Sequence, residues 1–263
     1  MSLNVPLTDT STSDVRVAAG GAQAMPAASV SDPPGPLLDA MVMAMASMAE
    51  PGEAGHHIQR TQLYLQALAG QLRSSAPHAH GWNDTDIDAM MRGAALHDIG
   101  NSAVPDRILL KPGRLTAEEI EVVRTHPLIG RDIIDQIRRN AGVDLPFLSF
   151  ARQIAYSHHE RWDGSGYPQG LAGDDIPAPA RLMAIVDAYD ALTSDRVYRD
   201  GVPHDKAVQL IFQERGAQFA PDMVDAFIEV QHVFQDIAQQ HAETESDLQK
   251  KMEYLANAIA ESP

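Results

Sequence analysis

The chain has 263 residues and a formal net charge of −16, with 36 Asp and Glu residues against 20 Lys and Arg. This charge disfavours binding to nucleic acid polymers or to anionic membrane surfaces, because the long-range field repels phosphates. The absence of cysteine excludes disulfides, thiolate metal sites and cysteine nucleophiles. We expect a cytoplasmic protein, since the sequence shows neither a secretory signal nor an apolar run of about 18 residues that could span a membrane.

The chain begins with a segment that is unsuited to form a core. Residues 1–36 are rich in Ser, Thr, Ala, Gly and Pro, which predicts a disordered tail. Beyond it, Leu38, Met41 and Met45 recur at helical spacing and predict an amphipathic helix over 37–50. Because a methionine stripe is typical of a core or of a contact between copies, this helix is a candidate homodimer interface.

Helical periodicity dominates the rest of the chain, and strand-like alternation is nearly absent. We therefore predict an all-α fold, with a helical domain over 37–241 and a charged C-terminal helix or tail over 242–263. Two stretches rich in Gly and Pro, 100–115 and 160–178, predict long ordered loops. Helical patterns occupy about 55–72, 84–98, 116–139, 145–159, 179–194, 204–214, 221–241 and 243–259.

The strongest local signal for chemistry is the sequence His97-Asp98-Ile99-Gly100, where an apolar helix meets a loop. Adjacent imidazole and carboxylate groups can both bind a metal ion, and a carboxylate has two oxygens able to bridge two ions. Taken alone, the pattern is more typical of a buried, hydrogen-bonded histidine beside an aspartate that ends a helix.

Other imidazoles and carboxylates at helix ends or in apolar helices favour a shared polar centre. One unpaired carboxylate in an apolar helix would be costly to bury, and several such groups are better explained by convergence on metal ions. A ligand set of imidazoles and carboxylates, without thiolates, indicates Fe, Mn or Zn as the bound metal. The candidates are His57, His126, His158, His159 and Asp187, with Glu53 four residues before His57.

Four separated blocks of this sequence resemble the HD-GYP domains, a family of metal-dependent cyclic di-GMP phosphodiesterases. The blocks are the segment 158–168 (HHERWDGSGYP), the segment 187–196 (DAYDALTSDR), the segment 108–115 (ILLKPGRL) and the pair His126-Pro127. The resemblance covers about residues 40–240. It implies an HD-domain helical bundle that holds two or three divalent metal ions, with Fe or Mn favoured, in a cleft.

The resemblance also assigns roles to individual positions. The implied metal ligands are His57, His97, Asp98, His126, His158, His159 and Asp187. Glu53 matches the position that binds a third ion in some members, although the run 50–55 is shorter than usual. Two neighbouring ions can lower the pKa of water and clamp phosphoryl oxygens, and Asp98 is the carboxylate expected to bridge them.

Substrate contacts are expected mainly after the last metal ligand. Arg196 and Arg199 match family positions that contact the cyclic dinucleotide, and their planar donors suit phosphate or a guanine edge. Asp190 and Tyr167 are further candidate substrate-binding residues. The Gly-Tyr-Pro element at 166–168 is expected to form a lip that contacts substrate or a signalling partner protein.

One position departs from the family pattern. The family usually has His-Asp-x-Gly-Lys, and here the fifth residue is Asn101. A lysine at this point offsets developing charge near the phosphate, and losing one such donor costs about 100- to 1,000-fold in rate. Asn101 is therefore expected to weaken catalysis rather than abolish it. Lys111 on the following loop is a candidate to replace the missing charge.

Three functions are compatible with these residues. The first is hydrolysis of cyclic di-GMP to pGpG, GMP or both, based on the metal-ligand set together with the two arginines. The second is a non-catalytic receptor for the dinucleotide or a protein-docking module, which Asn101 favours. The third is hydrolysis of another cyclic dinucleotide, such as a cyclic GMP-AMP, by the same centre.

Overall fold

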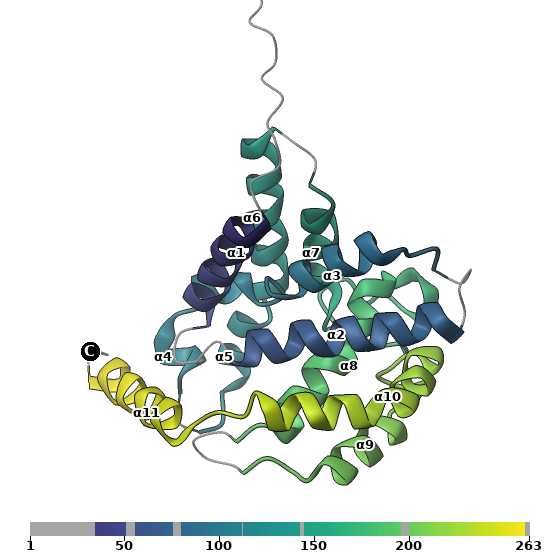
Figure 1. Cartoon of the computed structure of the whole chain (residues 1–263). Helices are drawn as coiled ribbons and strands as arrows, with labels where there is room; N and C mark the ends of the chain where they lie inside the picture. Colours follow the sequence, from purple (N-terminus) through teal and green to yellow (C-terminus); the bar gives the residue numbers. More distant parts are fainter. Residues whose placement is uncertain are drawn as a thin grey trace, which may run out of the picture. The chain divides into compact units, whose positions relative to one another are not determined.

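The computed structural model describes residues 35–50, 56–75, 80–111, 113–142, 145–195 and 200–260, without the side chains of 248, 250 and 255–260. The predicted all-α class is confirmed, because no β-strand forms in these ranges (Figure 1). The α-helices are α1 (Gly35–Ala49), α2 (His56–Ser75), α3 (Asp84–Ala94), α4 (Asp106–Leu109), α5 (Ala117–Val123), α6 (His126–Ala141), α7 (Pro146–Ser157), α8 (Ala178–Thr193), α9 (His204–Gln213), α10 (Pro221–Gln240) and α11 (Glu245–Ala260), and the short 3-10 helices are η1 (Ile99–Ala103) and η2 (Gly173–Asp175).

Helices α2, α8 and α10 form the larger of two hydrophobic clusters. Tyr64, Leu65 and Leu68 of α2 are fully buried there, at the spacing that keeps residues on one helix face. Tyr64 stacks on Phe234 of α10 with ring centroids 4.6 Å apart. Helices α2 and α10 consequently lie side by side (Figure 1).

Helices α3 and α7 contribute to both clusters and pack on each other. Met90 of α3 and Ile154 of α7 belong to the larger cluster. Ala89 of α3 and Leu148 of α7 belong to the smaller one, which includes residues of α1 and η1. Because both helices are buried on two sides, the residues that follow their C-terminal ends are held on a rigid base.

The helical pattern predicted over 116–139 is divided in two by the structure. Helix α5 begins at a capping box in which Thr116 and Glu119 each bind the other's backbone N–H. It ends at Val123, and α6 begins at His126 with Pro127 in its first turn. Proline lacks an N–H donor and cannot lie inside a helix without disturbing it, so the break falls just before it.

The structure does not test several expectations from the sequence. The predicted disordered tail 1–36 lies almost wholly outside the described residues, although α1 already begins at Gly35. On α1 the side chains of Leu37, Met41 and Met48 are exposed, and a homodimer through 37–50 stays a prediction. Among the described residues, no helix is both long and apolar enough to cross a membrane.

Candidate metal centre and its two cavities

Three histidines are oriented by the backbone of the helical turns that carry them. The Nδ1 atoms of His97, His126 and His158 lie 3.0, 2.7 and 3.0 Å from the carbonyl oxygens of Ala94, Val123 and Ile154. Each ring therefore donates its Nδ1–H to a carbonyl oxygen and presents Nε2 as an acceptor. These three Nε2 atoms are buried and have no hydrogen-bond partner. Such orientation by an outer partner is common for histidines that bind metals.

The carboxylate of Asp98 lies at the centre of these rings. Its Oδ1 is 3.3 Å from Nε2 of His126 and 3.5 Å from Nε2 of His158, and its Oδ2 is 3.7 Å from Nε2 of His97. The ring of His159 lies 4.0 Å from that of His158, centroid to centroid. Convergence of these residues, which the sequence predicted from separated segments, is thus present in the structure.

The donor set fits divalent metal ions. One ligand atom from each of Asp98, His126, His158 and His159 lies within 4.8 Å of the others. Buried acceptor atoms aimed at one another are costly unless a cation lies between them, since none can donate a proton to the next. A mixed imidazole and carboxylate set of this kind suits Fe, Mn or Zn better than Mg or Ca.

For three of the four imidazoles and for Asp98, the surroundings favour the protonation state that a metal ligand needs. Burial lowers the pKa of His97, His126 and His159, which keeps these imidazoles neutral. Burial opposes charge on His158 as well, but the nearby Asp98 outweighs it and raises the pKa of His158. For Asp98 burial acts in the opposite direction, yet the surrounding imidazoles, His97 first, hold its pKa well below the ordinary value.

A close backbone approach brings His126 to Asp98. A Cβ atom on Gly100 would lie 2.0 Å from the carbonyl oxygen of His126 and 2.7 Å from the backbone nitrogen of Gly130. Only glycine therefore allows η1 to pack so tightly on α6. The glycine of the His-Asp-Ile-Gly sequence is thus required by packing.

A second group of potential ligands joins the first through His97. Glu50, His57 and His97 also offer three atoms within 4.8 Å of one another. Nε2 of His57 is 3.5 Å from Glu50. The sequence predicted Glu53 at this place, but Glu53 lies outside the described residues and stays a prediction.

His57 is oriented by side chains instead of the backbone. Its Nδ1 lies 2.6 Å from Oδ2 of Asp190, which is 2% exposed. Arg60 donates to both oxygens of the same carboxylate, at 2.5 and 2.9 Å. Burial would raise the pKa of Asp190, but His57 and Arg60 outweigh it and hold that pKa far below normal. Asp190, predicted to bind substrate, is thus engaged by these two partners, and its contact with a substrate stays a prediction.

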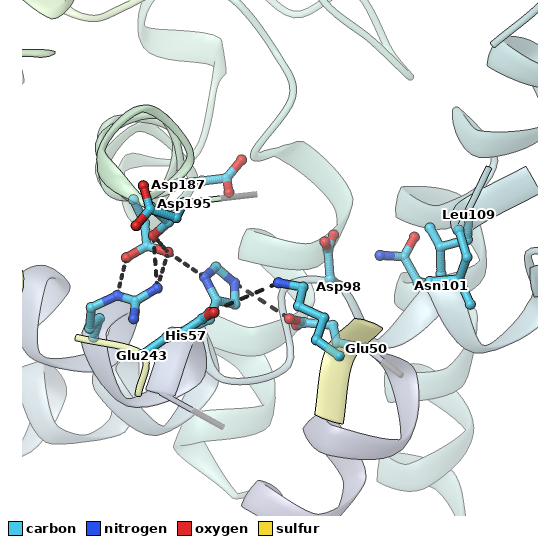
Figure 2. A pocket seen from close by; sticks show the side chains of 13 residues that line it. Glu50, His57, Asp98, Asn101, Leu109, Asp187, Asp195 and Glu243 are labelled. Carbon is cyan, nitrogen blue, oxygen red and sulfur yellow. Dashed lines mark hydrogen bonds and ion pairs between the residues drawn. The ribbon is translucent and has the colours of Figure 1, made fainter. Parts of the chain in front are cut away.

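A cavity of about 190 Å³, here called the carboxylate cavity, opens beside Asp98. The side chains of Asp98, Asp187, His57 and Glu50 surround a common space there (Figure 2). Asn101 lines it too, and its side-chain amide points toward Asp98 (Figure 2). The cavity is strongly acidic, since its lining includes six carboxylates, those of Glu50, Asp98, Asp187, Asp190, Asp195 and Glu243.

A second cavity of about 360 Å³, the tyrosine cavity, is lined by His158, His159, Tyr167 and Asp187. Asp187 therefore borders both cavities. Tyr167 stacks on His159 with centroids 4.9 Å apart, and the guanidinium of Arg124 lies 5.2 Å above its ring. The aromatic face and the cations of this cavity suit a flat, anionic ligand.

The loop that carries Tyr167 is anchored by a buried carboxylate. Glu160 is 3% exposed and accepts the backbone N–H groups of Gln169 and Leu171 at 2.7 and 3.1 Å. Sequence analysis assigned Glu160 no role. Its place in a loop that returns on itself could not be inferred from local pattern.

Of the remaining predicted substrate residues, only Lys111 lies among the described residues, and it is not brought into the centre. Lys111 lies outside both cavities, and its Nζ pairs with Glu119 at 2.7 Å. Arg196 and Arg199 lie outside the described residues and stay predictions. Sequence reasoning missed other residues that line the carboxylate cavity: Glu50, Arg60, Glu243 and Lys251. Of these, only Arg60 could have been suspected from the sequence, because it lies about one helical turn after His57.

Comparison with known proteins assigns the family. A family model described as HD domain matches residues 42–223, so the chain belongs to the HD domain family. A Vibrio cholerae protein named "Probable cyclic di-GMP phosphodiesterase" is 45% identical over 210 residues, which are 79% of this chain and 48% of that protein. Another V. cholerae protein, "3'3'-cGAMP-specific phosphodiesterase 2", is 36% identical over 187 residues, which are 71% and 33% of the two chains.

A solved structure shares the fold. It is a cyclic GMP-AMP specific phosphodiesterase of V. cholerae, which matches with a TM-score of 0.50 at 16% identity and covers 86% of this chain and 61% of that one. This chain spans about half or less of the length of the curated relatives named above. The family resemblance predicted from the motifs is confirmed, and divalent metal binding agrees with it.

Proposed function

We propose that the chain is a metal-dependent phosphodiesterase that hydrolyses cyclic di-GMP to pGpG, GMP or both. The observation that carries this proposal is the set of buried Nε2 atoms of His97, His126 and His158 around Asp98. A similar relative named as a cyclic di-GMP phosphodiesterase supports the choice of substrate. The ions are proposed to be Fe or Mn, two or three in number.

The protein residues divide the work between holding ions and positioning substrate. Asp98, His97, His126, His158 and His159 would hold ions, which when bound supply Lewis acidity toward water and the phosphodiester. Since the pKa of Asp98 is held well below normal, its carboxylate is ionised at neutral pH and both oxygens are available as ligands.

Asp190 and Arg60 would act indirectly, through the orientation of His57. Their pair fixes the ring of His57 so that Nε2 faces Glu50 and the cavity. Glu50 is proposed as a further ligand in that second group, as Glu53 was from the sequence. The decision between the two glutamates rests on metal content after Glu50→Gln and Glu53→Gln.

The tyrosine cavity is proposed to receive part of the nucleotide. Tyr167 presents a ring and a hydroxyl there, and burial raises the pKa of that hydroxyl so that it stays a neutral donor. Because Asp187 borders both cavities, a ligand that passes it can reach both. A signalling partner that binds the Gly-Tyr-Pro loop remains a second proposed role for the same surface.

The test is turnover of cyclic di-GMP by protein purified without air, stripped of metal and reconstituted separately with Fe, Mn and Zn. We expect linear product with Fe or Mn and about two or more ions per chain by mass spectrometry. No product with any metal would overturn the proposal. The same assay with a cyclic GMP-AMP tests the substrate alternative, which the 36% identical relative supports.

A receptor without catalysis is the second candidate, and Asn101 favours it. In the carboxylate cavity this residue brings a neutral amide where the family usually has a lysine. The variant Asn101→Lys separates the two. A weakened enzyme gains turnover, whereas a receptor binds cyclic di-GMP with and without the substitution and produces nothing.

A further inference from the structure

Among the described residues, two arginines line the tyrosine cavity, and the structure holds them differently. Arg161 donates from both terminal nitrogens, with Nη1 2.9 Å from Oε1 of Gln218 and Nη2 3.1 Å from Oε2 of Glu214. These bonds tie the loop that follows the histidine pair to the turn between α9 and α10. Arg161 therefore stabilises the fold, which leaves Arg124 as the candidate to bind a ligand.

The backbone of Arg124 is fixed, whereas its side chain is held weakly. Its backbone N–H donates to the carbonyl oxygen of Ile120 at 2.9 Å, at the C-terminal end of α5. Nη1 donates to Glu121 at 2.9 Å, but these two side chains are 50% and 70% exposed. Because water screens such a pair, it contributes little and competes weakly with a ligand. A guanidinium carries five N–H donors, and this contact uses one of them.

A stack of contacts connects Arg124 to the metal centre. Its guanidinium carbon lies over the ring of Tyr167, 5.2 Å from the ring centroid. The ring of Tyr167 in turn stacks on that of His159, with 4.9 Å between centroids and 20° between planes. His159 belongs to the proposed metal ligands. A flat group that enters the tyrosine cavity therefore meets an aromatic ring and a planar fork of donors close to the proposed ions.

The chemistry of these side chains distinguishes the parts of a dinucleotide. The proposed reaction needs the phosphodiester at the ions, whereas nucleobases stack on aromatic rings and on guanidinium planes. Guanine offers two neighbouring acceptors, O6 and N7, which match the fork of an arginine. Adenine offers N7 beside the N6 donor, so one donor of the fork would face another donor. The side chains of this cavity therefore suit guanine better than adenine.

We propose that Arg124 binds the O6 and N7 atoms of one guanine beside Tyr167 and thereby selects guanine over adenine in the tyrosine cavity. The inference rests on the proposed function and deepens it, because it names the base that enters this cavity and the residue that recognises it. A cyclic dinucleotide without guanine should bind without the contribution of this arginine. Cyclic di-AMP is the probe for that comparison.

The decisive experiment compares Arg124→Gln, Arg124→Lys and a control, Arg131→Gln. Arg131 lies on α6 in a matched arrangement: its guanidinium carbon is 4.5 Å from the ring centroid of Tyr156, it pairs with Asp132, and it lines neither cavity. Protein reconstituted with Fe or Mn gives KM and kcat for cyclic di-GMP and the inhibition constant of cyclic di-AMP, and mass spectrometry gives the metal content. We expect Arg124→Gln to raise KM for cyclic di-GMP by about 10- to 100-fold, the range for one bidentate contact with guanine. The value of kcat and the inhibition constant of cyclic di-AMP should change little.

The other variants separate recognition of the base from the effect of charge. Arg124→Lys keeps the positive charge but has one ammonium in place of the fork, so it should lose most of the preference for guanine. Arg131→Gln should match the unsubstituted protein. Metal content should be the same in all three variants, because Arg124 is connected to the centre only through the ring of Tyr167. Cyclic GMP-AMP, which carries one guanine, should be weakened by Arg124→Gln as cyclic di-GMP is.

Four results would overturn the inference. An unchanged KM in Arg124→Gln means that this arginine is only a surface cation. Equal weakening of cyclic di-GMP and cyclic di-AMP means that it meets a phosphate, and full selectivity in Arg124→Lys means that charge alone suffices. Loss of metal, or a fall in kcat at constant KM, means that Arg124 supports the metal centre through Tyr167. If the unsubstituted protein neither binds nor cleaves cyclic di-GMP or cyclic GMP-AMP, the proposed function itself fails, and that outcome is read from the unsubstituted protein alone.

Discussion

The two sides of the carboxylate cavity hold their histidines by different means. On the side of Asp98, the backbone carbonyls of Ala94, Val123 and Ile154 orient the rings. On the side of His57, a carboxylate from α8 does so, and an arginine from α2 holds that carboxylate in turn. The first arrangement depends on helix packing, whereas the second depends on two side chains that are distant in sequence.

This difference predicts how each side responds to substitution. A ring that is oriented by a carbonyl group keeps its orientation unless the helix itself moves. A ring that is oriented by Asp190 loses its partner with one substitution. The Asp98 side should therefore fail only through its ligands or its backbone, and the His57 side should also fail through Asp190 and Arg60, which hold the ring of His57 in place.

The largest effect is expected from Asp98→Asn. It removes the charge at the meeting point of His97, His126 and His158 while preserving shape, so we expect a loss of activity of more than about 100-fold, beyond the range for residues that only support ligands. Metal content should fall in parallel. Turnover and mass spectrometry check this, with Asp132→Asn on the exposed face of α6 as control. Full activity in Asp98→Asn would remove this residue from the centre.

Gly100→Ala tests the backbone on that same side. The added Cβ would meet the carbonyl oxygen of His126, so η1 and α6 must separate. We expect a destabilisation of about 1–3 kcal/mol and a fall in metal affinity. Chemical denaturation and metal titration measure the two effects. Gly70→Ala in α2 is the control, since nothing lies within 4 Å of its new Cβ. Equal behaviour of the two variants would contradict the close approach.

Asp190→Asn tests the opposite side. It leaves Arg60, which is 4% exposed, without its counter-charge, and we expect a loss of about 3 kcal/mol of stability. Metal affinity should fall by about 10- to 100-fold, because His57 loses its orienting partner. The matched control is Asp225→Asn, which breaks a two-bond pair with Arg215 on the surface. Because water screens that pair, little change is expected there.

The smallest effect is the pH dependence that Asp190 gives to the stability of the His57 side. Since the folded pKa of Asp190 is depressed, its ionised form stabilises the fold at pH values above the unfolded pKa of about 4. This contribution is lost as pH falls from about 4 toward the folded pKa. The stability difference between the unsubstituted protein and Asp190→Asn should therefore be full at pH 6 and shrink toward pH 3 in urea denaturation. A difference that grows on acidification would contradict the sign.

The sequence predicted most of the fold and the Asp98 side of the centre. Helical periodicity identified the class, and the histidines of that side lie in short segments that together match the family pattern in order and approximate spacing. The break at 124–125 within the stretch 116–139 was missed because apolar spacing continues through it, although Pro127 carried the information.

The other side depends on contacts between distant residues. Asp190 and Arg60 are 130 positions apart, and no sequence pattern near either residue indicates that the two form a pair. Lys251 lies in a charged helix whose periodicity is compatible with packing or with projecting into solvent. Only the path of the chain after α10 decides that it lines the cavity.

Glu160 has a consequence for how this protein can vary. Its two backbone acceptor contacts set the course of the chain at Gln169 and Leu171 without using any side chain of that loop. The exposed Ser165 can therefore be exchanged while the path of the chain at Gln169 and Leu171 is preserved, whereas the side chain of Gln169 itself donates to the buried Ser157. The rim of the tyrosine cavity is a place where recognition can diversify among related proteins at little cost to folding.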